Sequence, residues 1–143
     1  MTDDLAAGLN DEEKRRLHEI FAQIPFVHLI GMELEEVERG AATIRMEVSD
    51  GLKRNGGIVH GGAIASLIDS AAAFAIMTLL EPGKSTTTID LTIHYLRPLL
   101  KGQARARARV VRRGRRVTVV SIDVMNDSEV ITATALTSYL MLD

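Results

Sequence analysis

The chain has 143 residues and contains no cysteine, no tryptophan, three phenylalanines and two tyrosines. Without cysteine it cannot form a disulfide scaffold, a thiolate nucleophile or a cysteine-ligated metal site. The histidines lack the spacing of metal ligands, so we expect no metal and no other cofactor. The absence of cysteine also fits a reducing cytoplasm, which is the location that we expect. Because aromatic residues are scarce, aliphatic residues and methionine must build the core.

The chain also lacks an excess of either charge. Its formal net charge is -2 at pH 7, which argues against bulk attraction to nucleic acid or to anionic membranes. Residues 1–16 are rich in acidic side chains and contain no apolar run, so we expect no secretory signal there. With 46% hydrophobic and 25% charged residues, the composition fits a single globular domain over residues 1–143.

One apolar segment, residues 62–80, has the length of a membrane span, which requires ~20 residues. Asp69 lies near its middle, however, where an unpaired charge is costly in lipid. The alanines at 71–73 and 75 are only weakly hydrophobic, and everything downstream is patterned as strands. We therefore expect a helix that is buried inside a globular fold.

Hydrophobic periodicity predicts the other elements. A helix over residues 10–24 begins with a capping box at Asn10 and Glu13 and is closed by Pro25. Residues 49–61 are glycine-rich and are expected to form a loop. Alternating patterns predict strands over residues 32–37, 41–48, 86–95, 103–112, 117–125 and 130–142. The last three strands are joined by tight turns and should form an antiparallel meander.

These elements together indicate an α+β fold. A helix that is apolar on nearly all sides needs partners all round it, and period-2 alternation implies one buried sheet face. The economical arrangement is a curved antiparallel sheet wrapped around the long central helix. One small sheet is not expected to enclose the helix, so we expect a second subunit on the uncovered side.

The stretch NGGIVHGGAIASLID, residues 55–69, opens the central helix with glycines on both sides of a histidine. A helix N-terminus presents unpaired N–H groups and about half a positive charge, and Gly61 and Gly62 let a ligand approach them. A carbonyl oxygen placed there would be polarised, while His60 could bind substrate or orient the loop. Asp69 follows about two turns into the helix, where a buried carboxylate must be hydrogen-bonded or functional. A polarised carbonyl beside a carboxylate that attacks it or activates water indicates acyl transfer, which is hydrolysis when water is the acceptor.

The same stretch, with Asp69 nine residues after His60, resembles the motif of the PaaI-type hotdog-fold acyl-CoA thioesterases. Pro25–Glu33 (PFVHLIGME) is similar to the segment that leads into the family's first strand. Thr87–Pro98 (TTIDLTIHYLRP) is similar to the strand that follows the central helix. His-Gly-Gly alone is not specific, but its combination with the I-D-L-x-I-x-Y-x-R-P strand is.

The resemblance implies a hotdog fold in which two subunits join their sheets side by side, often pair again into a tetramer, and share active sites at the dimer interface. It implies that Asp69 acts as general base or nucleophile on an acyl-CoA thioester. The Gly61 N–H would polarise the thioester carbonyl, and His60 would help to position it. In the family a hydroxyl from the partner subunit commonly assists. Thr88 would supply it here, with Thr87 as a near neighbour.

Family members often carry an asparagine six residues before the histidine, where this chain has Arg54. Asn55 stands one residue later, and a loop shorter by one residue would bring it to the same place. A turn-forming role for Asn55 beside Gly56 is an equally open interpretation.

Seven arginines gather around one predicted hairpin. One interpretation is a solvated strand face, and the other is contact with the phosphates of coenzyme A. For the second interpretation we expect Arg112, Arg113 and Arg115 to bind the substrate. The full set is Arg105, Arg107, Arg109, Arg112, Arg113, Arg115 and Arg116.

Two other functions stay open at this point. The first is a non-catalytic acyl-CoA binding protein that uses the same pocket, and the second is a hotdog hydratase acting on an enoyl thioester. The acyl group is also open between aryl-acyl and medium-chain fatty acyl. We expect no nucleic-acid and no membrane partner.

Overall fold

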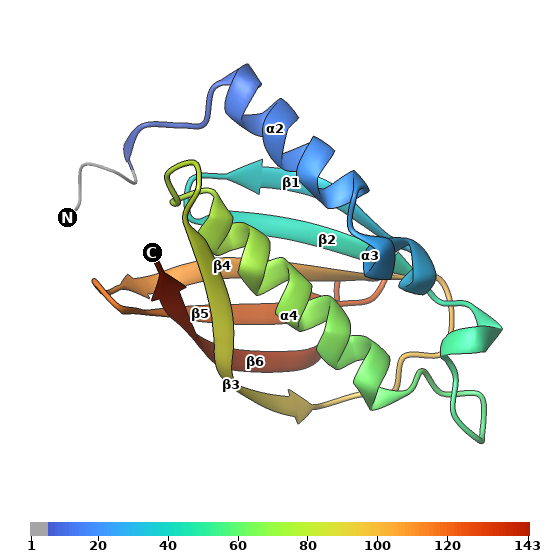
Figure 1. Cartoon of the computed structure of the whole chain (residues 1–143). Helices are drawn as coiled ribbons and strands as arrows, with labels where there is room; N and C mark the ends of the chain where they lie inside the picture. Colours follow the sequence, from blue (N-terminus) through green and yellow to red (C-terminus); the bar gives the residue numbers. More distant parts are fainter. Residues whose placement is uncertain (1–5) are drawn as a thin grey trace.

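The computed structural model describes residues 6–143 of the chain. Two helices, α2 (Asp11–Ala22) and α3 (Pro25–Ile30), precede strands β1 (Met32–Glu38) and β2 (Ala41–Glu47). The short 3-10 helix η1 (Asp50–Leu52) leads towards the long helix α4 (Gly61–Met77). The chain then forms four strands (Figure 1): β3 (Ser85–Tyr95), β4 (Gln103–Arg113), β5 (Val117–Met125) and β6 (Ile131–Leu142).

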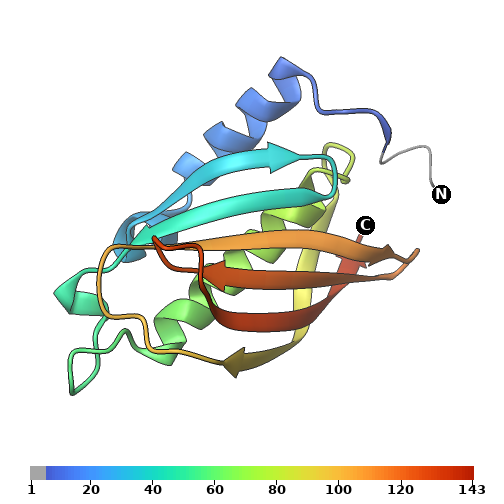
Figure 2. The ribbon, with the colours of Figure 1, turned by 180° about the vertical axis from the view of Figure 1, so that it is seen from behind.

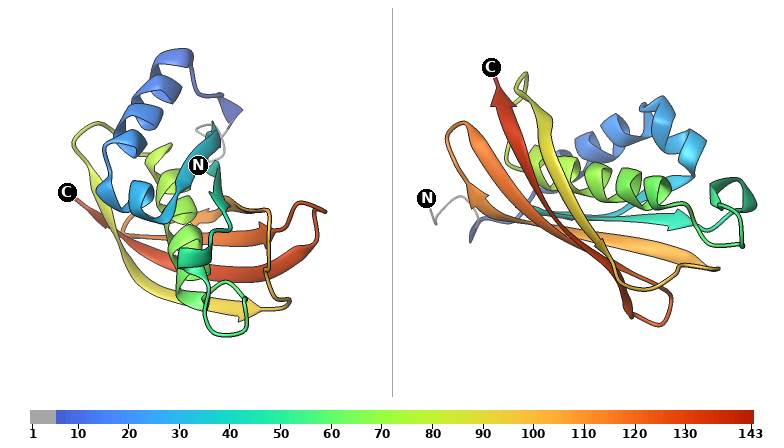
Figure 3. Two further views of the ribbon diagram at one scale, coloured as in Figure 1. Left: turned by 90° about the vertical axis from the view of Figure 1, so that its right-hand side faces the viewer. Right: turned by 90° about the horizontal axis from the view of Figure 1, so that it is seen from below.

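The six strands form one antiparallel sheet in the order β1-β2-β4-β5-β6-β3. The predicted meander β4-β5-β6 is confirmed, and the sheet curves around α4 (Figure 3). Seen from behind, the outer face of the sheet carries no helix of the described part of the chain (Figure 2). The predicted α+β architecture, a central helix wrapped by a curved antiparallel sheet, is therefore confirmed.

Small residues let α4 lie close to the sheet. In β4, Ala104, Ala106 and Ala108 are buried against the helix side, whereas the intervening arginines point outwards, as their alternation predicts. The buried side chains of α4 also include three alanines, at 71, 72 and 75; the full set is Ile64, Leu67, Ile68, Ala71, Ala72, Phe74, Ala75 and Ile76. None of the helices in residues 6–143 is long and apolar enough to cross a membrane.

The N-terminal segment differs from the prediction. The capping box is present, since the Glu13 N–H donates to Asn10 Oδ1 at 2.8 Å and the Asn10 N–H donates to Glu13 Oε2 at 2.9 Å. The first helix nevertheless ends at Ala22 rather than at residue 24, and Pro25 begins a second helix, α3, that the sequence interpretation missed. Proline is well suited to the first turn of a helix, because it has no N–H to leave unpaired there.

The central helix ends at Met77 rather than at residue 80. Its last turn is closed by a tertiary contact, because the hydroxyl of the buried residue Thr78 donates to the Ala75 carbonyl at 2.7 Å and accepts the Gly40 N–H at 2.7 Å. A contact across 38 residues of chain lies beyond any local pattern, which explains the difference.

Candidate active site

The first turn of α4 leaves one backbone donor available. His60 is the N-cap residue, and its Nδ1 accepts the Gly62 N–H at 2.8 Å. The His60 N–H donates to the Leu52 carbonyl at 2.8 Å, and the Ala63 N–H donates to the His60 carbonyl at 2.9 Å. The Gly61 N–H has no acceptor among residues 6–143. Gly61 therefore presents the free donor that the sequence predicts.

Gly62 is predicted to contact substrate, but the structure gives a different explanation for glycine at this position. A Cβ at this position would lie 2.9 Å from His60 Nδ1, which is too close for two unbonded heavy atoms. Gly62 thus makes room for the histidine cap, and its N–H is already occupied by His60. A neutral imidazole that accepts at Nδ1 carries its proton on Nε2, so His60 offers an Nε2–H donor beside the helix start.

Tyr95, at the end of β3, fixes the same turn from the other side. Its hydroxyl donates to the Gly61 carbonyl at 2.7 Å, and its ring would lie 3.2 Å from a Cβ at Gly61. Burial raises the pKa of Tyr95, so the phenol stays a donor at neutral pH. A larger residue at 61 would therefore press on the Tyr95 ring, so packing favours glycine at this position.

Asp69 is half-buried in the middle of α4, and two hydroxyls hold one of its oxygens. Thr88 Oγ1 donates to Asp69 Oδ1 at 2.9 Å, and the Tyr139 hydroxyl donates to the same oxygen at 2.6 Å. The Tyr139 hydroxyl also lies 2.7 Å from the Asp69 carbonyl oxygen. Burial and the hydrogen bond to Asp69 raise the pKa of Tyr139. The assisting hydroxyl of Thr88 thus reaches Asp69 within one chain, whereas we expected it to come from a partner.

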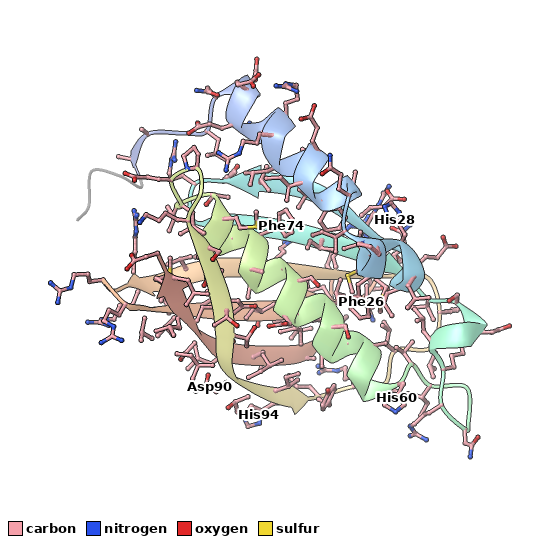
Figure 4. All side chains as sticks on the ribbon, viewed as in Figure 1. Phe26, His28, His60, Phe74, Asp90 and His94 are labelled. Atoms are coloured by element: carbon pink, nitrogen blue, oxygen red, sulfur yellow. The ribbon has the colours of Figure 1, made fainter. Side chains whose placement is uncertain are left out.

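Asp69 and Gly61 open onto separate cavities. A cavity of about 250 Å³ holds Asp69 and Thr87 with apolar neighbours that include Phe26 and Phe74. A second cavity of about 350 Å³ holds Gly61 and Tyr95 together with the two arginines Arg54 and Arg97. Figure 4 shows Phe26 and Phe74 towards the α3 side of α4, with His60 at the N-terminal end of that helix.

The separation of the two groups follows from helix geometry. Gly61 and Asp69 are eight residues apart on one helix, which corresponds to about 12 Å along its axis. Asp69 and Gly61 of a single chain therefore do not face the same substrate atom.

The other predicted residues lie elsewhere. Asn55 is exposed in the turn before α4, its carbonyl accepts a hydrogen bond from Arg54 Nη1 at 2.8 Å, and neither of the two cavities includes it. Arg112, Arg113 and Arg115 lie on and beside the β4–β5 hairpin, at the C-terminal end of α4 (Figure 1). Arg113 Nη2 donates there to the Leu79 carbonyl at 3.0 Å.

Three residues that the sequence interpretation did not assign to the site now join it. Tyr139 belongs to the last strand, where its spacing only indicates a core residue. Arg97 and Tyr95 stand in the strand motif that carries the family resemblance, but no local pattern indicates that they flank Gly61. The contact of Tyr139 with Asp69 spans 70 residues of chain, so only the fold reveals it.

The model of the thioesterase superfamily matches residues 56–133 of the chain. A predicted esterase from Saccharolobus solfataricus is 31% identical over 125 residues, which cover 87% of this chain and 83% of that protein. The chain belongs to the thioesterase superfamily. Within it, the medium/long-chain acyl-CoA thioesterase YigI of Escherichia coli is 29% identical and the alignment covers 96% of this chain and 99% of that protein.

Solved structures agree with this membership. The E. coli PaaI protein from the phenylacetic acid degradation operon superposes with a TM-score of 0.85 at 22% identity, covering 92% of this chain and 94% of that chain. A phenylacetic acid degradation-related protein from Ralstonia eutropha superposes with a TM-score of 0.80 at 29% identity, covering 90% of this chain and 98% of that chain. This superfamily member has the hotdog fold that the sequence predicts.

Proposed function

We propose that the chain is an acyl-CoA thioesterase that converts an acyl-CoA and water into a carboxylic acid and free coenzyme A. The observation that supports this proposal most is the hydrogen bonding of the Asp69 carboxylate. Its Oδ1 is held by two hydroxyls, and its Oδ2 accepts no hydrogen bond from the described residues. The relationship to E. coli YigI, whose name gives medium/long-chain acyl-CoA as its substrate, favours the same substrate class.

The active site forms across a two-fold axis, with Gly61 of one protomer facing Asp69 of the other. An antiparallel pair of α4 helices that brings residue 61 opposite residue 69 has its axis near Ala65, so both sites form at once. The α4 face that would meet the partner carries small side chains around Asp69, including Gly62, Ala65 and Ser66, which are exposed or half-buried. Short side chains let two helices approach closely.

The edge strand β3 supplies the second part of this interface. Among the described residues β3 pairs only with β6, and Ile89 on it is 55% exposed. An unpaired, partly apolar strand edge readily pairs with another strand. Pairing of β3 with its copy would continue the sheet through the dimer, as the family resemblance implies. A further pairing of dimers into a tetramer stays a prediction.

In this arrangement the Gly61 N–H binds the thioester carbonyl oxygen and stabilises the oxyanion as it forms. Asp69 Oδ2 of the partner subunit either attacks the carbonyl carbon or removes a proton from a water that attacks it. If Asp69 activates water, the tetrahedral intermediate collapses to the carboxylic acid and expels the coenzyme A thiolate, which takes up the proton that Asp69 removed. If Asp69 attacks directly, loss of the thiolate leaves a mixed anhydride on Asp69, and water then hydrolyses it to the carboxylic acid and restores the carboxylate. The His60 Nε2–H helps to position the carbonyl. A role of Asn55 at the site of the thioester stays a prediction.

The cavity at Gly61 fits the coenzyme A end of the substrate. Arg54 and Arg97 both line it, and guanidinium groups bind phosphate oxygens well. The cavity at Asp69 has an apolar wall that includes Phe26 and Phe74, which fits an uncharged acyl group. The choice between aryl-acyl and medium-chain acyl groups is left to a substrate panel. A single domain over residues 1–143 and a cytoplasmic location stay predictions.

The decisive experiment is thiol release from a panel of acyl-CoA substrates by the wild type and by Asp69→Asn. The amide keeps the volume and an oxygen for Thr88 and Tyr139, so the Tm should change by less than about 3 °C. The rate should fall by about 10²–10⁴-fold, because the base or nucleophile is lost. The matched control is Asp90→Asn on β3, whose carboxylate accepts the Ser138 N–H at 3.0 Å and which should keep full activity.

Near wild-type kcat in Asp69→Asn would show that the carboxylate is structural. Binding of acyl-CoA without thiol release by the wild type would favour the non-catalytic binding protein. A hydrated product that keeps its thioester would favour the hydratase.

Mixed dimers test the shared site separately. Gly61→Val and Asp69→Asn should each be inactive, but a dimer of one with the other contains one intact site. Co-expression should therefore restore about a quarter of the wild-type activity if subunits pair at random. Absence of any recovery in isolated mixed dimers would contradict a site built from two protomers.

A further inference from the structure

We propose that Tyr139 is a positioning residue that, together with Thr88, fixes Oδ1 of Asp69 and leaves Oδ2 as the reacting oxygen. This inference rests on the proposed function, because it concerns the carboxylate of the same site. The family resemblance indicates the hydroxyl of Thr88, but nothing in the sequence indicates that of Tyr139. The register of two neighbouring strands brings them to one atom.

The sheet brings the two hydroxyls together. Thr88 on β3 and Tyr139 on β6 are directly paired across the ladder. The register shifts between Thr88 and Asp90, so Ile89 is an extra residue in β3. Such a bulge re-aims the side chains beside it. Here Ile89 lies exposed, while Thr88 reaches Asp69 on α4.

The contacts fix the carboxylate relative to the helix. The Tyr139 hydroxyl lies 2.6 Å from Asp69 Oδ1 and 2.7 Å from the Asp69 carbonyl oxygen, so it ties the side chain to its own backbone. Thr88 holds Oδ1 from a second direction at 2.9 Å. With two donors on Oδ1, rotation of the carboxylate would break both bonds. Asp69 lines the cavity, and Oδ2 is thereby held in a fixed orientation, which is what a reaction with a placed substrate requires.

A purely structural role for the Tyr139 hydroxyl makes a different prediction. Tyr139 is only 2% exposed, and a buried phenol needs a hydrogen-bond partner. The Asp69 carbonyl alone would satisfy it. If that were all, loss of the hydroxyl would lower stability and leave the rate of a folded enzyme unchanged.

The test compares Tyr139→Phe with a buried hydroxyl on the same strand that does not touch Asp69. Thr137 is fully buried and donates to the Asp90 carbonyl at 2.6 Å, so Thr137→Val serves as the matched control. We expect kcat of Tyr139→Phe to fall by about 10–100-fold with KM nearly unchanged, because misplacement of a reacting group by about 1 Å has effects of this size. Thr137→Val should lose some thermal stability and keep its kcat.

The double variant shows whether Tyr139 acts through Asp69. In an Asp69→Asn background, Tyr139→Phe should change the residual rate by less than about twofold, since there is no reacting carboxylate left to position. The same fold-loss in both backgrounds would overturn the inference, and so would an unchanged kcat in Tyr139→Phe. Full activity of Asp69→Asn alone would instead overturn the proposed function, so the two failures are distinguishable.

A second pair of variants keeps the inference testable if Tyr139→Phe does not fold. Thr88→Val removes the hydroxyl at constant shape, and Thr88→Ser retains it. We expect Thr88→Val to lower kcat and Thr88→Ser to restore most of it. Equal rates in the two variants would show that Oδ1 does not need both donors and would overturn the inference.

Discussion

The two ends of α4 are built in opposite ways. At the C-terminal end the last backbone groups are occupied: Arg39 Nη1 donates to the Thr78 carbonyl at 3.1 Å, and Arg113 Nη2 donates to the Leu79 carbonyl at 3.0 Å. At the N-terminal end Gly61 keeps a free N–H among the described residues, and the first turn contains no acidic residue. One end is closed by the protein itself, and the other is left open.

The first turns of α2 and α4 differ in sequence, so the open N-terminal end of α4 is not common to the helices of this chain. The first turn of α2 contains three acidic side chains, Asp11, Glu12 and Glu13, and its capping box pairs the Glu13 N–H with Asn10. Acidic side chains at a helix N-terminus neutralise its partial positive charge. Since α4 carries none there, its positive end is available to an oxyanion. Helix α4 is thus anchored by side chains at its C-terminal end and keeps a free donor at its N-terminal end, where the proposed function places the thioester carbonyl.

Of the changes at the two ends of α4, a substitution that fills the open end should lower activity most. Gly61→Ala places a methyl group 3.2 Å from the Tyr95 ring and beside the free N–H, so it disturbs both the turn and the approach of a carbonyl. We expect kcat/KM for an acyl-CoA to fall by about 10²-fold, comparable with the loss of one oxyanion donor. The control is Gly51→Ala, where the added Cβ meets no other atom of residues 6–143 within 4 Å apart from its immediate chain neighbours. Equal activity of the two variants would argue that the open end has no catalytic role.

Breaking the closed end should cost stability rather than rate. Thr78→Val removes the oxygen that accepts the buried Gly40 N–H at 2.7 Å, and an unsatisfied buried donor costs about 1–3 kcal/mol. Urea unfolding should show this loss, while kcat of the folded variant should stay within about twofold of wild type. Thr78→Ser keeps the hydroxyl and should recover most of the stability. A drop in kcat as large as that of Gly61→Ala would erase the distinction between the two ends.

The elements that the sequence predicts best are those whose signals are local. Alternation places Ala104, Ala106 and Ala108 on the buried face of β4, and the capping box places the start of α2. The helix α3 was missed because its six residues are too few to show a period, and Pro25 was interpreted only as a terminator. The end of α4 was misplaced because the Thr78 contact with Gly40 is tertiary.

The candidate site divides in the same way. His60, Gly61 and Asp69 stand at a fixed spacing on one segment, so the sequence alone suffices to propose their roles. Tyr139 could not be inferred, because its link to Asp69 depends on the register between β3 and β6 and on the bulge at Ile89. The division of Gly61 and Asp69 between two cavities also needed the fold, since a motif does not say which side chains face the same space.

The smallest expected effect is a change in KM on removal of arginines, and it tests which end of α4 binds the phosphates of coenzyme A. Arg54 and Arg97 line the cavity at the open end, whereas Arg112 and Arg115 lie beside the closed end. Exposed ion pairs contribute about 0.2–1 kcal/mol each, so the Arg54→Ala/Arg97→Ala double variant should raise KM about threefold to tenfold and leave kcat nearly unchanged. Its KM should also depend less on ionic strength than that of the wild type, because screening acts on the charges that have been removed.

In a dimer with antiparallel α4 helices, the hairpin of one protomer lies beyond the Gly61 end of the other, so Arg112→Ala/Arg115→Ala is the matched comparison. A larger KM increase in that variant would assign the phosphates to the hairpin arginines that the sequence first indicated.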